Sequence, residues 1–150
     1  MTTLIIGIDP GQSGGIAAIL NDNRLREATK MPETERDIVD LLREYRDMAA
    51  SEGAEIKCYL ESVHAMPAQG VRSVWTFGRG FGILIGVLAA LEIPYELVTP
   101  QKWQKAVGCL TRGDKNVSKR KAQQLFPMVP KITHYLADAL LIAHYGVSKT

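Results

Sequence analysis

Apolar residues at the start of the chain fall into short runs, and later ones recur at the spacing of amphipathic helices. The runs LIIGID (4–9) and GGIAAIL (14–20) are separated by the turn PGQS, so they predict two strands. A third, shorter strand is predicted over 26–31. Further along the chain, AEIKCYLE (54–61) and PYELVTP (94–100) also have strand character.

Helical periodicity begins at Thr34 or Glu35 and continues to Ala50, where Ile38, Leu42 and Tyr45 share one stripe. Further helices are predicted over 71–91, 101–107, 115–126 and 133–145. Strands interspersed with helices in 150 residues predict a single α/β domain, residues 1–150, in which helices cover a mixed sheet.

The helix over 71–91 carries glycines at regular spacing, Gly78, Gly82 and Gly86. Each glycine in a helix costs about 1 kcal/mol relative to alanine, which favours a packing reason for the set. A strip of glycines lets another backbone approach closely. We expect a buried central helix or, in addition, a subunit interface.

Composition excludes several classes of protein. Cys58 and Cys109 stand far apart without a CxxC or Cys/His spacing, which argues against a zinc site or a disulfide framework. The apolar runs are interrupted before the ~18 residues of a membrane span, and Asp9 interrupts the first of them without a basic segment before it. These features predict a cytoplasmic protein without a membrane partner.

Charge is distributed unevenly around the formal net value of +2. Residues 33–55 hold eight acids against three arginines, a local balance of −5, whereas 101–131 holds eight bases against Asp114, a balance of +7. A concentrated basic segment is typical of a site that binds nucleic acid.

Three acids occupy unusual positions. Asp9 and Glu61 each end an apolar strand, and Asp138 lies among apolar residues in the last helix, in LADALLIA. Carboxylates are seldom buried unless they are paired or bound to a metal. If the two strands are neighbours and the last helix crosses their ends, three carboxylates converge, and their hard oxygens favour Mg²⁺ or Mn²⁺.

Two histidines lie close to these acids in the sequence. His134 precedes Asp138 by four residues and therefore shares its helical face, which makes it a candidate proton carrier. His64 follows Glu61 by three residues, at the exit of the same strand.

Five motifs follow one another along nearly the whole chain: IIGIDPGQSGGIA, YLESVHAM, TPQKWQKAVG, GDK…KRKAQQLFP and HYLADALLIAHYG. In this order they resemble the motifs of the RuvC family of Holliday junction resolvases. The resemblance implies an RNase H-like fold, with a five-stranded mixed sheet flanked by helices. It also implies a homodimer that binds four-way DNA junctions and cuts two strands by paired symmetric nicks, using divalent metal.

The resemblance also implies roles for individual residues. Asp9, Glu61 and Asp138 match the family's metal-binding acids. The family usually places a further acid or a histidine three residues before the last aspartate; here Tyr135 has that position and His134 lies one residue earlier. His64 stands where the family has an aromatic residue that opens the junction.

The basic segment has counterparts in the family as well. Lys105 and Lys115 match lysines near the scissile phosphate, and the helix over 71–91 matches the dimerising helix. We expect further contacts to the DNA backbone from Lys102, Arg112, Lys119, Arg120 and Lys121.

Two Mg²⁺ or Mn²⁺ ions held by this acid set would position the attacking and leaving oxygens of a phosphodiester. In this interpretation Asp9 bridges both ions, Glu61 and Asp138 each complete one side, His134 is a ligand or relays a proton, and Lys105 or Lys115 stabilises charge on the phosphate.

Three alternatives remain open. One is an RNase H-fold nuclease acting on other branched or single-stranded DNA, and another is a DNA-binding module without catalysis. An actin-like or sugar-kinase ATPase also begins with a strand, an aspartate and glycines, but it needs a second lobe that 150 residues without a repeat do not provide. No GxxxxGK[ST] phosphate loop is present.

Overall fold

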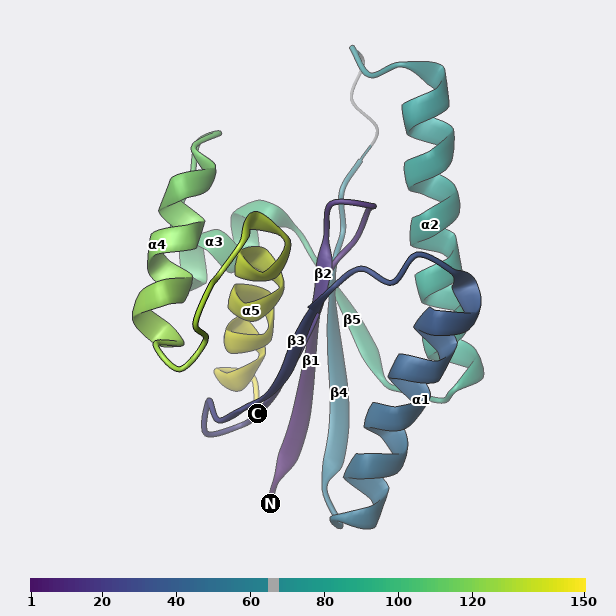
Figure 1. Cartoon of the computed structure of the whole chain (residues 1–150), viewed down its shortest axis with the longest axis vertical. Helices are drawn as coiled ribbons and strands as arrows, with labels where there is room; N and C mark the ends of the chain where they lie inside the picture. The colour runs from purple at the N-terminus through teal and green to yellow at the C-terminus, as the bar shows by residue number, and fades with distance from the viewer. Residues whose placement is uncertain (65–67) are drawn as a thin grey trace.

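A five-stranded sheet forms the centre of the molecule (Figure 1). The computed structural model describes residues 1–64 and 68–150. The sheet has the order β3-β2-β1-β4-β5. The strands are β1 (Thr3–Asp9), β2 (Gly15–Leu20), β3 (Leu25–Lys30), β4 (Glu55–Glu61) and β5 (Tyr95–Val98).

Antiparallel and parallel pairing are combined in this sheet, which confirms the predicted mixed topology. β2 pairs antiparallel with both β1 and β3, whereas β4 runs parallel to β1, and β5 runs parallel to β4. The register pairs Ile8 with Leu60 and Glu61 with Val98. The carboxyl ends of β1, β4 and β5 therefore meet at the same end of the sheet.

Helices cover both faces of the sheet (Figure 1). One face carries α1 and α2, and the other carries α3, α4 and α5. Their bounds are α1 (Glu35–Ser51), α2 (Val71–Ala90), α3 (Pro100–Val107), α4 (Lys115–Leu125) and α5 (His134–Val147). All ten elements agree with the sequence predictions to within a few residues.

The central strand β1 is apolar on both faces because it is covered twice. Ile6 and Ile8 pack into the core beneath α1 and α2, whereas Ile5 faces the core beneath α5. Successive residues of a strand point to opposite faces, so a strand covered on both sides appears in the sequence as a continuous apolar run.

The last helix lies unusually close to β1 and β2. A Cβ atom on Gly7 would overlap the backbone of Ala139 and Ala143, and a Cβ atom on Gly15 would overlap the carbonyl oxygen of Tyr135. Two strand positions without a side chain thus let the α5 backbone rest directly on the sheet. This contact fixes the first turn of α5 next to the end of β1.

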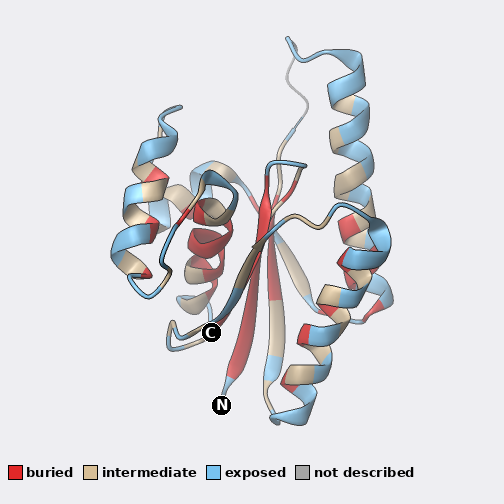
Figure 2. Cartoon of the chain, viewed as in Figure 1, coloured by how far each residue is buried: buried red, intermediate tan, exposed pale blue. Residues whose placement is uncertain are grey.

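The expectation of a buried central helix over 71–91 is wrong. In α2 only Leu84, Val87 and Leu88 are buried, and Figure 2 shows most of the helix exposed. The glycines Gly78, Gly82 and Gly86 face open space. Periodicity found the helix, but it did not reveal that the chain covers only its carboxyl-terminal part.

By length and composition alone, α2 is also the one helix in the described part of the chain that is apolar enough to cross a membrane. The sequence expectation differed because Arg72 and Arg79 interrupt the apolar run. Core helices of soluble proteins and signal sequences share this length and composition.

Candidate active site

Asp9 and Glu61 lie side by side at the end of the sheet. Each is the last residue of its strand, and β1 and β4 are adjacent and parallel, with Ile8 and Leu60 in register. A tight turn follows Asp9, in which the Gly14 amide donates to the Gly11 carbonyl at 3.1 Å. Gly11 has a φ of 101°, a conformation that side chains disfavour, so the turn depends on glycine there.

Electrostatics show that the carboxyl groups of the site are close together. Burial, followed by the negative charges of Glu61 and Asp138, raises the pKa of Asp9 from 3.8 to about 9. Burial likewise raises the pKa of Glu61, whose side chain also shares a hydrogen bond with Asp9. Both shifts favour the protonated form of these carboxyl groups.

Asp138 joins the pair from α5. Burial raises the pKa of Asp138, and a hydrogen bond from Ser118 and the positive charges of Lys115 and His134 oppose that rise. The negative charge of Asp138 acts on both Asp9 and Glu61, so the three acids lie in the same part of the molecule, at the end of β1 and β4. Within residues 1–64 and 68–150, however, no three His, Cys, Asp or Glu side chains are placed so that they could hold a metal ion.

Two buried side chains that the sequence analysis missed contact these acids. The Trp103 indole Nε1 donates to Glu61 Oε2 at 2.7 Å. The Ser118 side chain, 3% exposed, bonds to Asp138. One feature of the sequence could have indicated Trp103: it stands in a short helix directly after a strand. A tryptophan buried there needs an acceptor for its indole N–H, and the acids at the strand ends are the nearby candidates.

Lys115 is the basic residue whose charge acts on the carboxylates. It lowers the pKa values of both Asp9 and Asp138 relative to what burial alone would give. Lys115 is exposed and is the first residue of α4, after the N-cap Asp114. A helix amino terminus disfavours a cation, so this position is not explained by the stability of α4.

The remaining basic candidates are not among the charges that shift the pKa values of the three acids. Lys119 and Lys121 of α4 are half-buried, and Lys121 interacts with Cys109 and His144 rather than with the carboxylates. The other members of the set are exposed on α3, on α4 and in the loop between them: Lys102, Lys105, Arg112 and Arg120.

The two candidate histidines are both exposed. His134 is the first residue of α5 and acts electrostatically on Asp138, as the shared helical face predicted. His64 lies three residues beyond the end of β4. Ala65 and Met66, which complete the motif YLESVHAM, lie outside the described residues.

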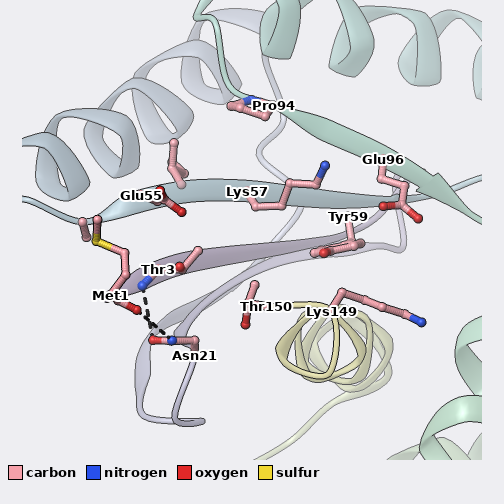
Figure 3. A pocket seen from close by; sticks show the side chains of 12 residues that line it. Met1, Thr3, Asn21, Glu55, Lys57, Tyr59, Pro94, Glu96, Lys149 and Thr150 are labelled. Atoms are coloured by element: carbon pink, nitrogen blue, oxygen red, sulfur yellow. Dashed lines mark hydrogen bonds between the residues drawn. The ribbon is translucent and has the colours of Figure 1, made fainter.

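A separate hollow of about 1130 Å³ lies at the opposite end of the sheet, where β1 begins (Figure 3). Its lining includes Lys57 and Tyr59 of β4, Glu96 of β5 and Lys149 near the carboxyl terminus. Asp9, Glu61 and Asp138 do not line it. The hollow is therefore unrelated to the acid cluster.

No family model matches the chain, and no curated protein matches its sequence. Solved structures do match it. Thermus thermophilus RuvC in complex with a Holliday junction substrate has a TM-score of 0.61 at 18% identity, covering 95% of this chain and 91% of that one. A further T. thermophilus RuvC structure has a TM-score of 0.61 at 17% identity, covering 97% and 92%.

A more distant neighbour is the yeast mitochondrial Holliday junction resolvase Ydc2, with a TM-score of 0.54 at 11% identity, covering 95% of this chain and 77% of that one. The similarity to all three structures extends over almost the whole chain. The resemblance found in the sequence motifs is thus confirmed at the level of architecture: the chain has the RNase H-like α/β fold of RuvC.

Proposed function

We propose that the protein is a metal-dependent endonuclease that resolves four-way DNA junctions by paired symmetric nicks. The observation that carries this proposal is the meeting of Asp9, Glu61 and Asp138 at one end of the sheet, beside helices rich in lysine and arginine. The RuvC fold, seen in a neighbour bound to a Holliday junction substrate, supports it.

Carboxylate oxygens are the ligand type that a hard divalent cation prefers, although in the described residues the three acids are not placed to hold an ion together. The negative charges of Glu61 and Asp138 raise the pKa of Asp9, and that of Asp138 raises the pKa of Glu61, so a cation among them would relieve the repulsion. Asp9, Glu61 and Asp138 would hold two Mg²⁺ or Mn²⁺ ions, with His134 beside them. When bound, such ions supply Lewis acidity and an activated water for phosphodiester hydrolysis.

The protein's own residues then divide the remaining tasks. Lys115, whose charge reaches Asp9 and Asp138, would hold the scissile phosphate and stabilise its negative charge. His134, exposed and close to Asp138, would carry a proton to or from the reacting oxygens. Lys102, Lys105, Arg112, Lys119, Arg120 and Lys121 would hold the flanking DNA backbone, and His64 would contact the junction.

Paired nicking requires two active sites, and α2 offers a surface on which two copies could join. Val71, Trp75, Gly78, Gly82 and Gly86 fall on one stripe of this helix, and all five are exposed. Glycines would let two helices approach closely, and an exposed tryptophan is a common anchor in interfaces. We therefore place the homodimer interface on α2.

The decisive experiment incubates the protein with labelled four-way, Y-shaped and linear duplex DNA, with and without Mg²⁺ or Mn²⁺. We expect metal-dependent nicks placed symmetrically on two strands of the four-way substrate, and little cleavage of the linear duplex. Asp9→Asn should abolish nicking while junction binding persists. Equal cleavage of Y-shaped DNA would favour a broader branched-DNA nuclease, and binding without any cleavage would overturn the proposed catalysis.

A further inference from the structure

The hydrogen bond between Trp103 and Glu61 is buried at both ends. The indole Nε1 donates to Glu61 Oε2 at 2.7 Å; Trp103 is fully buried, and Glu61 is 7% exposed. An indole N–H is a donor only, so it needs an acceptor when water is excluded. Glu61 is the acceptor that the fold supplies, and the bond therefore restrains both side chains.

The backbone holds these two residues in register. Glu61 pairs with Val98, and the Ser62 amide donates to the Val98 carbonyl at 2.8 Å. The chain then passes through the N-cap Thr99, whose side chain accepts from the Lys102 amide, into α3. The pairing of β4 with β5 thus places α3, and with it Trp103, next to Glu61 at the end of β4.

The chemical type of the donor is informative. A lysine or arginine at this place would orient Glu61 but would also neutralise it and compete with a cation for its charge. The indole N–H orients one carboxylate oxygen and leaves the net charge of the group unchanged. Donors to metal-bound side chains commonly act in this way, by fixing the orientation of the ligand.

We propose that Trp103 is a positioning residue, which holds the Glu61 carboxylate in the orientation that binds divalent metal. This inference rests on the proposed metal-dependent function. Lys102 and Lys105 are exposed on the same helix as Trp103. One helix, α3, would therefore both contact DNA through its lysines and orient the Glu61 carboxylate through Trp103.

The test measures Mn²⁺ affinity by electron paramagnetic resonance on the full chain without DNA. Trp103→Phe removes the N–H and keeps an aromatic ring in the core. We expect its affinity for Mn²⁺ to fall about tenfold, the low end of the usual effect of losing such a donor. Phe126→Leu is the matched control, because it disturbs the same core cluster without touching the acids; it should retain wild-type affinity.

A spectroscopic measurement keeps the proposal testable even if Trp103→Phe folds poorly. The chain has two tryptophans, so two indole N–H resonances are expected in a ¹⁵N-labelled sample. Glu61→Ala should shift the Trp103 resonance upfield, because its charge-assisted hydrogen bond is lost. The resonance of Trp75, which is 72% exposed on α2, should not move.

The outcomes separate the two proposals. If the wild-type protein binds Mn²⁺ and nicks junctions while Trp103→Phe does both equally well, the positioning role is overturned and the proposed function stands. An equal loss of Mn²⁺ affinity in Phe126→Leu, or an unmoved Trp103 resonance in Glu61→Ala, would also overturn it. Failure of the wild-type protein to bind Mn²⁺ at all would overturn the metal-dependent function itself, and the positioning role with it.

Discussion

The acid cluster costs the folded protein stability when its carboxyl groups ionise. The pKa of Asp9 is raised from 3.8 to about 9, so its folded form prefers to keep a proton that the unfolded chain releases. The stabilising effect of that proton is complete below about pH 4 and is lost as the pH rises toward 9. Groups that serve a site commonly cost stability in this way.

Asp9→Asn removes the group that must ionise. At pH 8 without metal, we expect the variant to be more stable than the wild type by about 1–3 kcal/mol, or roughly 3–8 °C in Tm. The difference should shrink toward pH 4. Thermal unfolding at both pH values checks this, and Asp47→Asn, an exposed acid of α1, is the control. A stability difference that does not depend on pH would contradict the explanation.

Either His134 or Tyr135, the first two residues of α5, could act beside Asp138 in catalysis. The charge of His134 acts on Asp138, whereas Tyr135 occupies the position at which the RuvC family usually has an acid or a histidine. We expect His134→Ala to lower the nicking rate about 10²-fold and to alter its pH profile, because a proton carrier is removed. Tyr135→Phe should change neither. If the pH profile of His134→Ala is unaltered, His134 is not a proton carrier and has only a structural role.

At the scale of secondary structure, close packing of α5 on the sheet determines where Asp138 lies. Gly15 is the contact point, since any side chain there would overlap the Tyr135 backbone one turn before Asp138. The sheet provides Asp9 and Glu61 as fixed strand ends. The position of the third acid, Asp138, therefore depends on how closely α5 approaches β1 and β2.

Gly15→Ala should push the first turn of α5 away from β2. We expect a loss of about 1–3 kcal/mol in the free energy of unfolding, the usual cost of overpacking, together with a nicking rate reduced more than tenfold. Denaturant unfolding and a nicking assay measure the two effects. Gly70→Ala is the control, because a methyl group there meets open space. Wild-type cleavage by Gly15→Ala would show that Asp138 does not require this contact.

The exposed stripe of α2 allows the proposed dimer interface to be tested by mutation. Trp75→Glu places a charge in the middle of the proposed interface, and we expect dimerisation to weaken at least tenfold. Thr76→Glu puts the same charge on the same helix but off the stripe, and it should leave the dimer intact. Analytical ultracentrifugation distinguishes the two. Equal effects, or none, would place the interface elsewhere.

At the scale of the whole molecule, α1 and α4 lie on opposite faces of the sheet (Figure 1) and carry opposite net charges. The helix α1 is rich in acids, whereas α4 on the other face carries Lys115, Lys119, Arg120 and Lys121 without an acid. On a bound polyanion, such a separation would orient the protein, because α1 would be repelled and α4 attracted.

Junction binding should therefore weaken steeply with salt. If Lys119 and Arg120 each neutralise one phosphate, replacing both with Gln should reduce the slope of log K against log salt by about 1.8. The slope is measured by fluorescence anisotropy of a labelled junction at salt concentrations from about 50 to about 200 mM. Arg36→Gln and Arg43→Gln in α1 form the control pair. An unchanged slope in the α4 variant would remove these residues from the interface.

The sequence predicted every strand and helix because local patterns determine them: β1 is a double-sided apolar run, and α1 has a clear stripe. It also singled out Asp9, Glu61 and Asp138 as candidates, since acids at the edges of apolar elements are conspicuous. The partners Trp103 and Ser118 were missed because they reach the acids only through strand pairing and helix packing. The exposure of α2 was missed because a periodic stripe does not specify what covers it.

The two tryptophans occupy opposite environments, Trp103 fully buried against Glu61 and Trp75 largely exposed on α2. The molecule thus carries two intrinsic fluorophores, one at the proposed metal-binding end of the sheet and one on the proposed interface. With either tryptophan replaced by phenylalanine, the emission of the other would report a single event, either metal binding or subunit association. Both steps could then be timed separately in a stopped-flow instrument without an added dye.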